Sequence, residues 1–279
     1  MIDRDGAPSP ARALRSLASP KGEAKGASCL ASPLGEASER SERVRGRPLK
    51  HPLTREEFAT PEGRRRARRD FLFNDHAIVR MAFDNSREIA PGVWRSYQPS
   101  PAHLEKWAAR GIKTVVNLRG PRPSAALFLE EEACARLGLA LVNFRVYSRE
   151  APSLETLRGA RELFARIDYP ALFHCKSGAD RVGVMSALYL FFTGKAPLDE
   201  ALSQLSLRYG HVKHGKTGVI DAAFERYLAH ARANDISLSD VEAFFDWAAS
   251  TAYDPAAIKR EFMGSWWGNF LTERVLRRE

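Results

Sequence analysis

Short apolar runs alternate with longer segments of helical period between residues 94 and 195. The apolar runs are rich in β-branched residues and predict strands, whereas spacing of apolar positions three and four apart predicts helices. The predicted strands cover 112–118, 139–146 and 171–174, and the predicted helices cover 124–137, 154–167 and 182–192. Strands that alternate with helices indicate the α/β class, with a central, mostly parallel sheet flanked by helices.

Beyond residue 195 the pattern is helical throughout. The apolar positions predict helices over 197–207, 219–233, 239–249, 255–263 and a last one ending at 278. The earlier helix at 182–192 is apolar on nearly every face but too short to span a membrane, so we expect it to be the central buried helix. A helical C-terminal extension over 197–279 therefore follows the α/β region.

The N-terminal segment differs in composition. Residues 1–52 are rich in Ala, Ser, Pro, Gly and charge, and such a segment cannot bury enough apolar surface to order itself. We expect a disordered basic tail over 1–70, followed by one domain over 71–279. The basic run at 64–69 is typical either of a surface that binds nucleic acid or anionic lipid, or of a solvated helix end.

Charge narrows the choice of partners. The chain carries a net charge of +9, but residues 1–70 hold 16 of the 43 Lys/Arg and only 10 of the 34 Asp/Glu. Residues 71–279 are then close to neutral at +3, which gives no general case for nucleic-acid binding.

Three cysteines, Cys29, Cys134 and Cys175, are too few and too scattered for a disulfide or zinc framework. Unpaired thiols favour a reducing compartment, and we expect a cytoplasmic protein without metal or cofactor.

The candidate catalytic residues lie in the segment 170–183, where an apolar strand ends at Cys175 and a long apolar helix begins near Arg181. A helix N-terminus and nearby cations favour the thiolate form of a cysteine, which is its nucleophilic form. Gly178 allows the backbone to curl so that successive N–H groups collect an anion, and the guanidinium of Arg181 can bind two phosphate oxygens. This pattern predicts a phosphate cradle that contains a nucleophile.

The spacing His174-Cys175, five residues, Arg181 resembles the signature of cysteine-based tyrosine and dual-specificity phosphatases. The segments 94–100 and 111–119 resemble the first strands of the bacterial dual-specificity branch, which includes phosphatase domains joined to an NAD kinase. The resemblance implies that Cys175 attacks phosphorus and forms a phosphocysteine that water then hydrolyses. It also implies a metal-independent phosphomonoesterase with a dual-specificity phosphatase-like fold.

Further roles follow from the same resemblance. His174 is expected to orient the surroundings of the thiolate, and the phosphate is expected to bind Lys176, Ser177, Gly178, Ala179 and Arg181. The general acid has two candidates. Asp180 directly precedes the signature arginine and can protonate the leaving oxygen, although Asp also caps helices. Glu150 lies where relatives carry an acid on a separate loop, although it can equally be a solvated loop residue.

Val182 departs from the family, which usually carries Ser or Thr after the signature arginine. A valine cannot hydrogen-bond the sulfur as it leaves, so we expect slower hydrolysis of the phosphoenzyme. A non-catalytic phosphate-binding module stays open on this ground. A rhodanese-like persulfide carrier also stays open, because it too uses a cysteine loop, although Arg181 at this spacing fits phosphate better.

The substrate is expected to be a phosphorylated protein or a lipid or small-molecule phosphate. Charge at Lys176 favours a polyanionic substrate. The basic and titratable side chains of the loop 208–218 can bind additional phosphates or can equally be solvated surface groups. The aromatic stretch 262–270 predicts either contact with a membrane interface or packing onto the domain.

Overall fold

The structure, a computed structural model, describes residues 53–75 and 85–276, with residues 267–276 as backbone only. The expectation of disorder for residues 1–52 lies outside the described residues.

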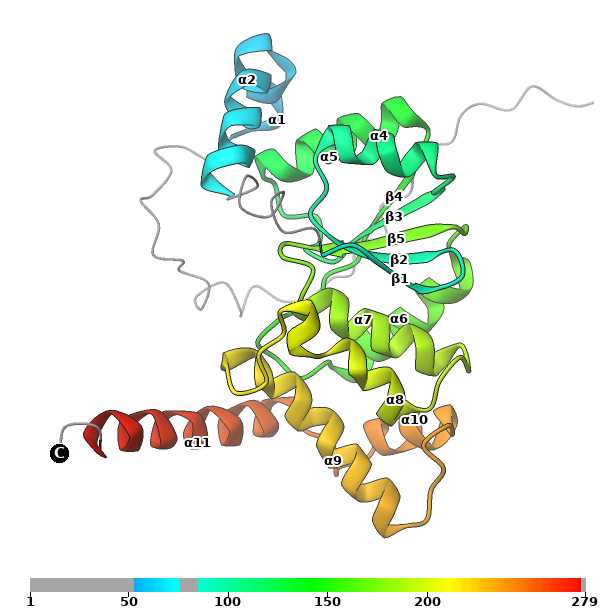
Figure 1. Cartoon of the computed structure of the whole chain (residues 1–279), viewed down its shortest axis with the longest axis vertical. Helices are drawn as coiled ribbons and strands as arrows, with labels where there is room; N and C mark the ends of the chain where they lie inside the picture. The colour runs from blue at the N-terminus through cyan, green and yellow to red at the C-terminus, as the bar shows by residue number, and fades with distance from the viewer. Residues whose placement is uncertain (1–52, 76–84, 277–279) are drawn as a thin grey trace, which may run out of the picture. The chain divides into compact units, whose positions relative to one another are not determined.

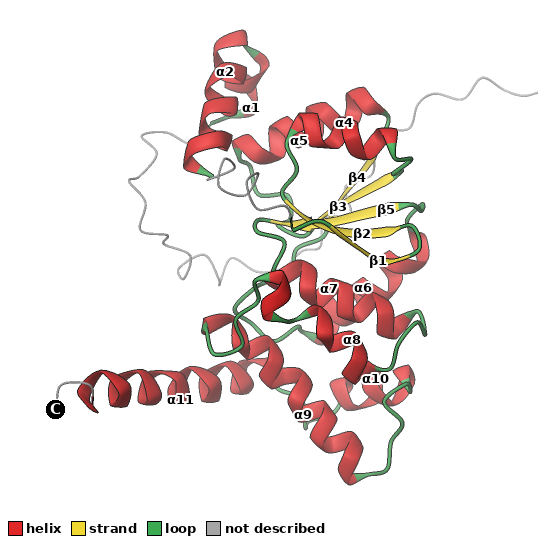
Figure 2. Cartoon of the chain, viewed as in Figure 1, coloured by secondary structure: helices red, strands yellow, loops and turns green. Residues whose placement is uncertain are grey.

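Five strands form one sheet in the order β1(Arg87–Ala90), β2(Val93–Tyr97), β5(Ala171–Cys175), β3(Thr114–Asn117), β4(Ala140–Asn143). All neighbours are parallel except β1, which pairs antiparallel with β2. Figure 1 shows helices on both faces of this sheet, and Figure 2 separates the layers by element type. The predicted α/β class with a mostly parallel sheet is confirmed.

The helices on the two faces are α4(Pro101–Ala109) and α5(Ala125–Leu137) on one side, and α6(Leu154–Arg166) and α7(Asp180–Phe192) on the other (Figure 1). Side chains alternate between these faces along β5, as they do on any strand. Leu172 joins the apolar cluster of α4 and α5, whereas Phe173 and Cys175 join the cluster that includes Met185 of α7. The predicted burial of the helix after the cysteine is confirmed, because α7 is buried along almost its whole length.

The C-terminal extension is helical as predicted, with α8(Leu198–Ala201), α9(Val219–Ala233), α10(Val241–Ala249) and α11(Pro255–Leu276). Two predicted boundaries are wrong. The helix expected over 197–207 is only α8 with two short 3-10 turns, because the chain turns at Leu205 to pack against Gly183. The two last helices are one continuous α11, since the exposed Gly264 costs a helix only about 1 kcal/mol.

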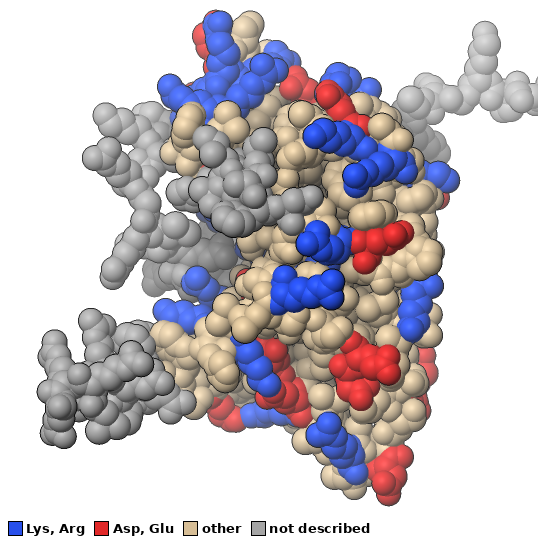
Figure 3. All heavy atoms as spheres, in the orientation of Figure 1, with Lys and Arg blue, Asp and Glu red and all other residues tan. Residues whose placement is uncertain are grey.

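The N-terminal helices α1(Arg55–Ala59) and α2(Pro61–Arg69) and the π turn η2(Asp70–Asn74) pack onto α5. Residues 53–70 are therefore mostly helical and packed on the domain, whereas the sequence predicts a disordered tail up to residue 70. The physical reason is a small apolar cluster in which Leu53, Ala67 and Phe71 cover the side chain of Phe128 and its neighbours on α5. Basic side chains cover α2 on its outer side, whereas acidic and basic side chains are interspersed over the helical extension (Figure 3).

In the part of the chain that the structure describes, no helix is both long enough and apolar enough to cross a bilayer.

Candidate active site

Cys175 is the last residue of β5, the middle strand of the sheet, and is 2% exposed. Four residues separate it from α7, which begins at Asp180. The carboxyl end of a central parallel strand is where open α/β sheets bind their ligands. The fold therefore places the thiol at the carboxyl end of the central strand, before the N-terminus of a buried helix.

Gly178 gives the loop after Cys175 its shape. Its φ of +74° lies in the left-handed region, and a Cβ atom there would be 2.9 Å from the backbone nitrogen of Tyr97. Only glycine satisfies both the backbone angle and the close approach to β2 without strain. The loop can thus curl against the neighbouring strand.

The carbonyl groups of this loop are held by donors from outside it. Lys176 O accepts from the backbone N–H of Gln98 at 3.3 Å, and Gly178 O accepts from the Asn85 amide at 2.9 Å. Arg95 donates to Gly178 O at 2.9 Å and to Ala179 O at 3.2 Å. Carbonyls fixed on one side of a tight loop leave the N–H groups for the other side, which is the arrangement that binds an anion.

Arg95 of β2 is the principal support of the loop, a role that residue spacing along the chain does not predict. Its side chain is fully buried, donates to the backbone and side-chain oxygens of Gln204 at 2.8 Å each, and stacks 4.0 Å from the ring centre of Tyr209. Burial lowers the pKa of the guanidinium to about 10, partly offset by Cys175 and Tyr209, so it stays charged at neutral pH. An arginine inside an otherwise buried strand was the signal available in the sequence, because such a charge must be paired.

The signature arginine and the residue after it have different surroundings. Arg181 is half-buried in the first turn of α7 and makes no hydrogen bond or ion pair with the described residues. Val182 is fully buried in the same apolar cluster as Cys175, and its carbonyl accepts from the Ser186 hydroxyl. Arg181 is thus available to a ligand, whereas Val182 contributes only apolar surface.

His174 faces away from the thiol. Its Nε2 atom lies 2.6 Å from Oε1 of Glu130 on α5, and both side chains are almost fully buried. Since neighbouring residues of a strand point to opposite faces, His174 and Cys175 lie on different sides of the sheet. His174 can therefore influence the loop through the strand, whose carbonyl at His174 accepts from Leu118 N–H at 2.9 Å.

Asp180 belongs to a chain of three side chains whose middle member, His211, is fully buried. His211 Nδ1 lies 2.7 Å from Asp180 Oδ1, and His211 Nε2 lies 2.7 Å from Asp221 Oδ2. Burial opposes protonation of His211, but the hydrogen bonds and charges of the two carboxylates outweigh it and raise its pKa to about 9. At neutral pH the imidazole is charged and donates from both nitrogens.

Glu150, the other candidate acid, forms an ion pair with Lys259 of α11 at 2.8 Å. Within the described residues, no hydrogen bond or ion pair joins Glu150 to the loop 174–181. Asp180 therefore lies at the end of the loop and is bonded to His211, whereas Glu150 is bonded to α11.

The loop 208–218 does not present its basic groups together. His211 is buried between its carboxylates, Lys213 pairs with Glu225, and Lys216 lies 5.1 Å from the ring centre of Trp266. Sequence reasoning identified the loop but not Asp221, which lies on α9, ten residues beyond His211.

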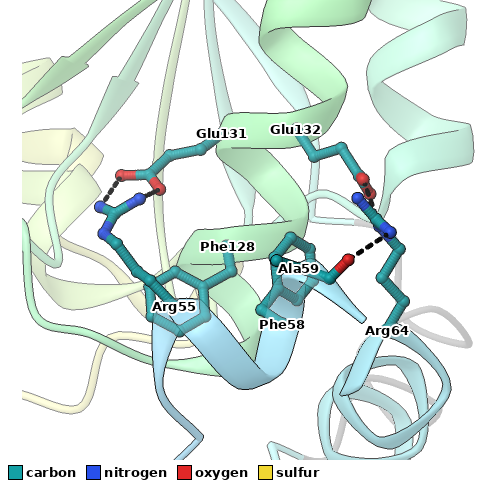
Figure 4. A pocket seen from close by; sticks show the side chains of 7 residues that line it. All are labelled: Arg55, Phe58, Ala59, Arg64, Phe128, Glu131 and Glu132. Atoms are coloured by element: carbon teal, nitrogen blue, oxygen red, sulfur yellow. Dashed lines mark hydrogen bonds and ion pairs between the residues drawn. The ribbon is translucent and has the colours of Figure 1, made fainter. Parts of the chain in front are cut away.

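A cleft of about 300 Å³ lies between α1 and α5. Figure 4 shows Phe58 and Phe128 between two ion pairs, Arg55 with Glu131 and Arg64 with Glu132. None of the residues that line it belongs to the loop 174–181, so it is separate from the candidate active site.

A strand, a cysteine loop with an arginine and a buried helix define the class of protein tyrosine and dual-specificity phosphatase-like folds. The family model described as "DSP-PTPase phosphatase fused to NAD+ Kinase" matches residues 75–220. The match covers more than half of the chain, which therefore belongs to this phosphatase family.

Several solved structures are similar at low identity. TpbA from P. aeruginosa, in complex with pTyr, is 18% identical, with 49% of this chain and 82% of that chain covered and a TM-score of 0.41. Tk-PTP in its active form is 23% identical, with coverages of 48% and 90% and a TM-score of 0.38. PTPMT1 is 14% identical, with coverages of 53% and 99% and a TM-score of 0.40. No curated protein matches the chain.

Proposed function

We propose that this chain hydrolyses phosphomonoesters without a metal, through a phosphocysteine on Cys175. The observation that carries the proposal is the loop from Cys175 to Arg181, whose carbonyls are bound from outside by Arg95, Asn85 and Gln98. Such a loop turns its N–H groups toward the position of a phosphate bound in front of the sulfur.

In the first step the Cys175 thiolate attacks phosphorus, so that an S–P bond forms and the bond to the ester oxygen breaks. The loop N–H groups and the half-buried Arg181 stabilise the charge on the three non-bridging oxygens. Lys176, Ser177, Gly178 and Ala179 supply the loop amides in this proposal, and the leaving oxygen takes a proton.

In the second step water attacks the phosphocysteine. A P–O bond forms, the S–P bond breaks, and inorganic phosphate leaves together with the regenerated thiolate. A base takes one proton from the attacking water. Val182 offers no hydroxyl to the departing sulfur, and we propose that this step limits turnover.

Asp180 is the proposed proton donor to the leaving oxygen and the base for the water. Because the charged His211 donates to the Asp180 carboxylate over 2.7 Å, the proton comes from His211. It moves to Asp180 as Asp180 protonates the leaving oxygen, which leaves His211 neutral, and the proton that Asp180 later takes from the attacking water restores the charged imidazole. Asp180→Asn should lower kcat about 100-fold or more for an alkyl phosphate, whose alkoxide is a poor leaving group, and much less for an aryl phosphate. Glu150→Gln should change both rates less than twofold, and the reverse pattern would assign the acid to Glu150.

The proposed catalytic unit includes the helical extension, because Gln204, Tyr209, His211 and Asp221 support the loop or its neighbours. Substrates in this proposal are phosphorylated proteins, most simply phosphotyrosine, or lipid and small-molecule phosphates. A thiolate nucleophile suits the reducing cytoplasm.

The experiment is phosphate release with a chelator present from an aryl phosphate and a phosphotyrosine peptide. Cys175→Ser should abolish turnover, whereas Cys134→Ser should retain it. Cys134 is a matched control because it is also a buried thiol, but it lies on α5. Burial and the nearby Glu130 and Glu131 raise the pKa of Cys134 to about 12, so this thiol is not a nucleophile at neutral pH. Phosphate binding without turnover by the native protein would instead identify a phosphate-binding module.

A further inference from the structure

A second group of charged and polar side chains lies beside the cysteine loop. Gln98 directly follows β2, Arg119 comes two residues after β3, and Lys176 directly follows β5. These strands are neighbours in the order β2, β5, β3, so the three side chains start from adjacent carboxyl ends of the sheet. Lys176 is also the first residue of the proposed phosphate loop.

The carboxylate of Asp75 connects the two cations. Its Oδ1 atom lies 3.2 Å from Lys176 Nζ and 3.2 Å from Arg119 Nη2, and its Oδ2 atom lies 3.2 Å from Arg119 Nη1. The Asp75 side chain is only 16% exposed. Arg119 thus binds a carboxylate with both of its terminal nitrogens, in the geometry that also suits a phosphate.

Gln98 completes the group. Its Oε1 atom accepts from Arg119 Nη1 at 3.0 Å, and the side chain is 2% exposed. Arginine can only donate, so Gln98 turns its oxygen toward Arg119. The buried amide nitrogen Nε2 of Gln98 has no hydrogen-bond partner among the described residues, which leaves its two N–H groups for an additional acceptor.

The charges of this group do not balance with Asp75 alone. Two cations, Arg119 and Lys176, share one carboxylate of charge −1, whereas a phosphomonoester carries about −1.5 to −2 at neutral pH. A phosphate also has three acceptor oxygens, enough for the arginine, the lysine and the unpartnered amide of Gln98.

We propose that Arg119, Lys176 and Gln98 form a second anion subsite, which binds a second phosphate on the substrate and which Asp75 fills in its absence. The proposal rests on the proposed function, because the first phosphate is the one that Cys175 attacks. The ligand class is a compound with two phosphate groups on one small carbon skeleton, whether soluble or the headgroup of a lipid.

The test compares two ligands that differ by one phosphate. A soluble inositol monophosphate and an inositol bisphosphate with vicinal phosphates are assayed as substrates and as inhibitors of aryl phosphate hydrolysis. The measured quantity is the ratio of their affinities. A third arm presents the bisphosphorylated phosphatidylinositol in phosphatidylcholine vesicles, and a preference for one arm identifies the soluble or the lipid source.

Asp75→Asn should raise the preference for the bisphosphate about tenfold, because the competing carboxylate charge is removed. Arg119→Gln should lower the preference at least tenfold, and Asp75→Asn should have no effect in its background. Asp70→Asn is the matched control: Asp70 opens the π turn that Asp75 follows but pairs with Arg66, so the ratio should stay at its native value.

An unchanged ratio in both Asp75→Asn and Arg119→Gln would overturn the subsite. Thermal unfolding of each variant shows whether the variant is still folded. Arg119→Lys, which keeps the charge but not the two-nitrogen contact, should show an intermediate preference for the bisphosphate. If the native protein turns over no phosphate ester, calorimetric binding of the same two inositol phosphates still decides the question. The subsite and the proposed reaction can thus fail separately.

Discussion

The contact of His211 with Asp180 and Asp221 predicts a stability that decreases at alkaline pH. The pKa of His211 is raised from 6.5 to about 9 in the folded protein, because the two carboxylates outweigh the effect of burial. Between these pH values the folded state binds one proton more than the unfolded state, so the free energy of unfolding falls as pH rises. The stabilisation is fully present below pH 6.5 and is lost as pH rises through about 9.

The magnitude follows from the size of the pKa difference. A difference of about 2.5 pH units corresponds to about 3 kcal/mol at 25 °C, with a slope of at most about 1.4 kcal/mol per pH unit. The His211 imidazole is fully buried, so solvent screens its interaction with the two carboxylates only weakly, and most of this free energy contributes to stability. This is a large part of the stability of an ordinary domain.

Urea unfolding between pH 6 and pH 9.5 measures the effect as the difference between the native protein and His211→Gln. The native free energy of unfolding should fall by about 3 kcal/mol more than that of the variant, which cannot bind the proton. His214→Gln, at an exposed histidine on the same loop, should keep the native pH dependence. Equal pH dependence in the native protein and His211→Gln would refute the reasoning.

Three further substitutions test the loop and its support. Arg95→Met should destabilise the fold by roughly 3 to 5 kcal/mol and weaken phosphate binding, since it leaves buried carbonyls unpaired; urea unfolding and phosphate inhibition of turnover measure both, and unaltered inhibition would contradict the role in the loop. Gly178→Ala should lose phosphate binding, whereas Gly194→Ala, which shares the positive φ but has no atom within 4 Å of an added Cβ, should retain it; equal loss in both would show that the φ angle alone matters. Val182→Thr should accelerate hydrolysis of the phosphoenzyme several-fold in a rapid-quench experiment, and an unchanged rate would remove the explanation based on the missing hydroxyl.

Much of the α/β region could be predicted from periodicity, because its elements are regular and bounded by clear signals. The helix at α5 ends at Gly138 in the left-handed conformation, as a C-terminal glycine predicts. The break after α8 could not be predicted in this way. It depends on Leu205 packing against Gly183 and on Arg95 binding the Gln204 carbonyl, which are contacts between distant parts of the chain.

The residues of the candidate site also fall into two groups, those that local spacing predicts and those that only the tertiary structure brings together. Local spacing is sufficient to predict Cys175 and Arg181, since the loop that holds them is continuous in sequence. Arg95 on β2 and Asp75 after the π turn contact the loop, and Asp221 on α9 contacts His211, only through tertiary structure. A charged residue in an apolar pattern indicates that a partner exists, but spacing alone does not identify that partner.

The most direct test of the central claim is to trap the phosphoenzyme. The native protein is mixed with an aryl phosphate, quenched with acid within the first turnovers and mapped by peptide mass spectrometry. The account predicts a phosphate on Cys175, absent in Cys175→Ser and unaffected in Cys134→Ser. Turnover without any phosphocysteine, or a phosphate on another residue, would contradict it.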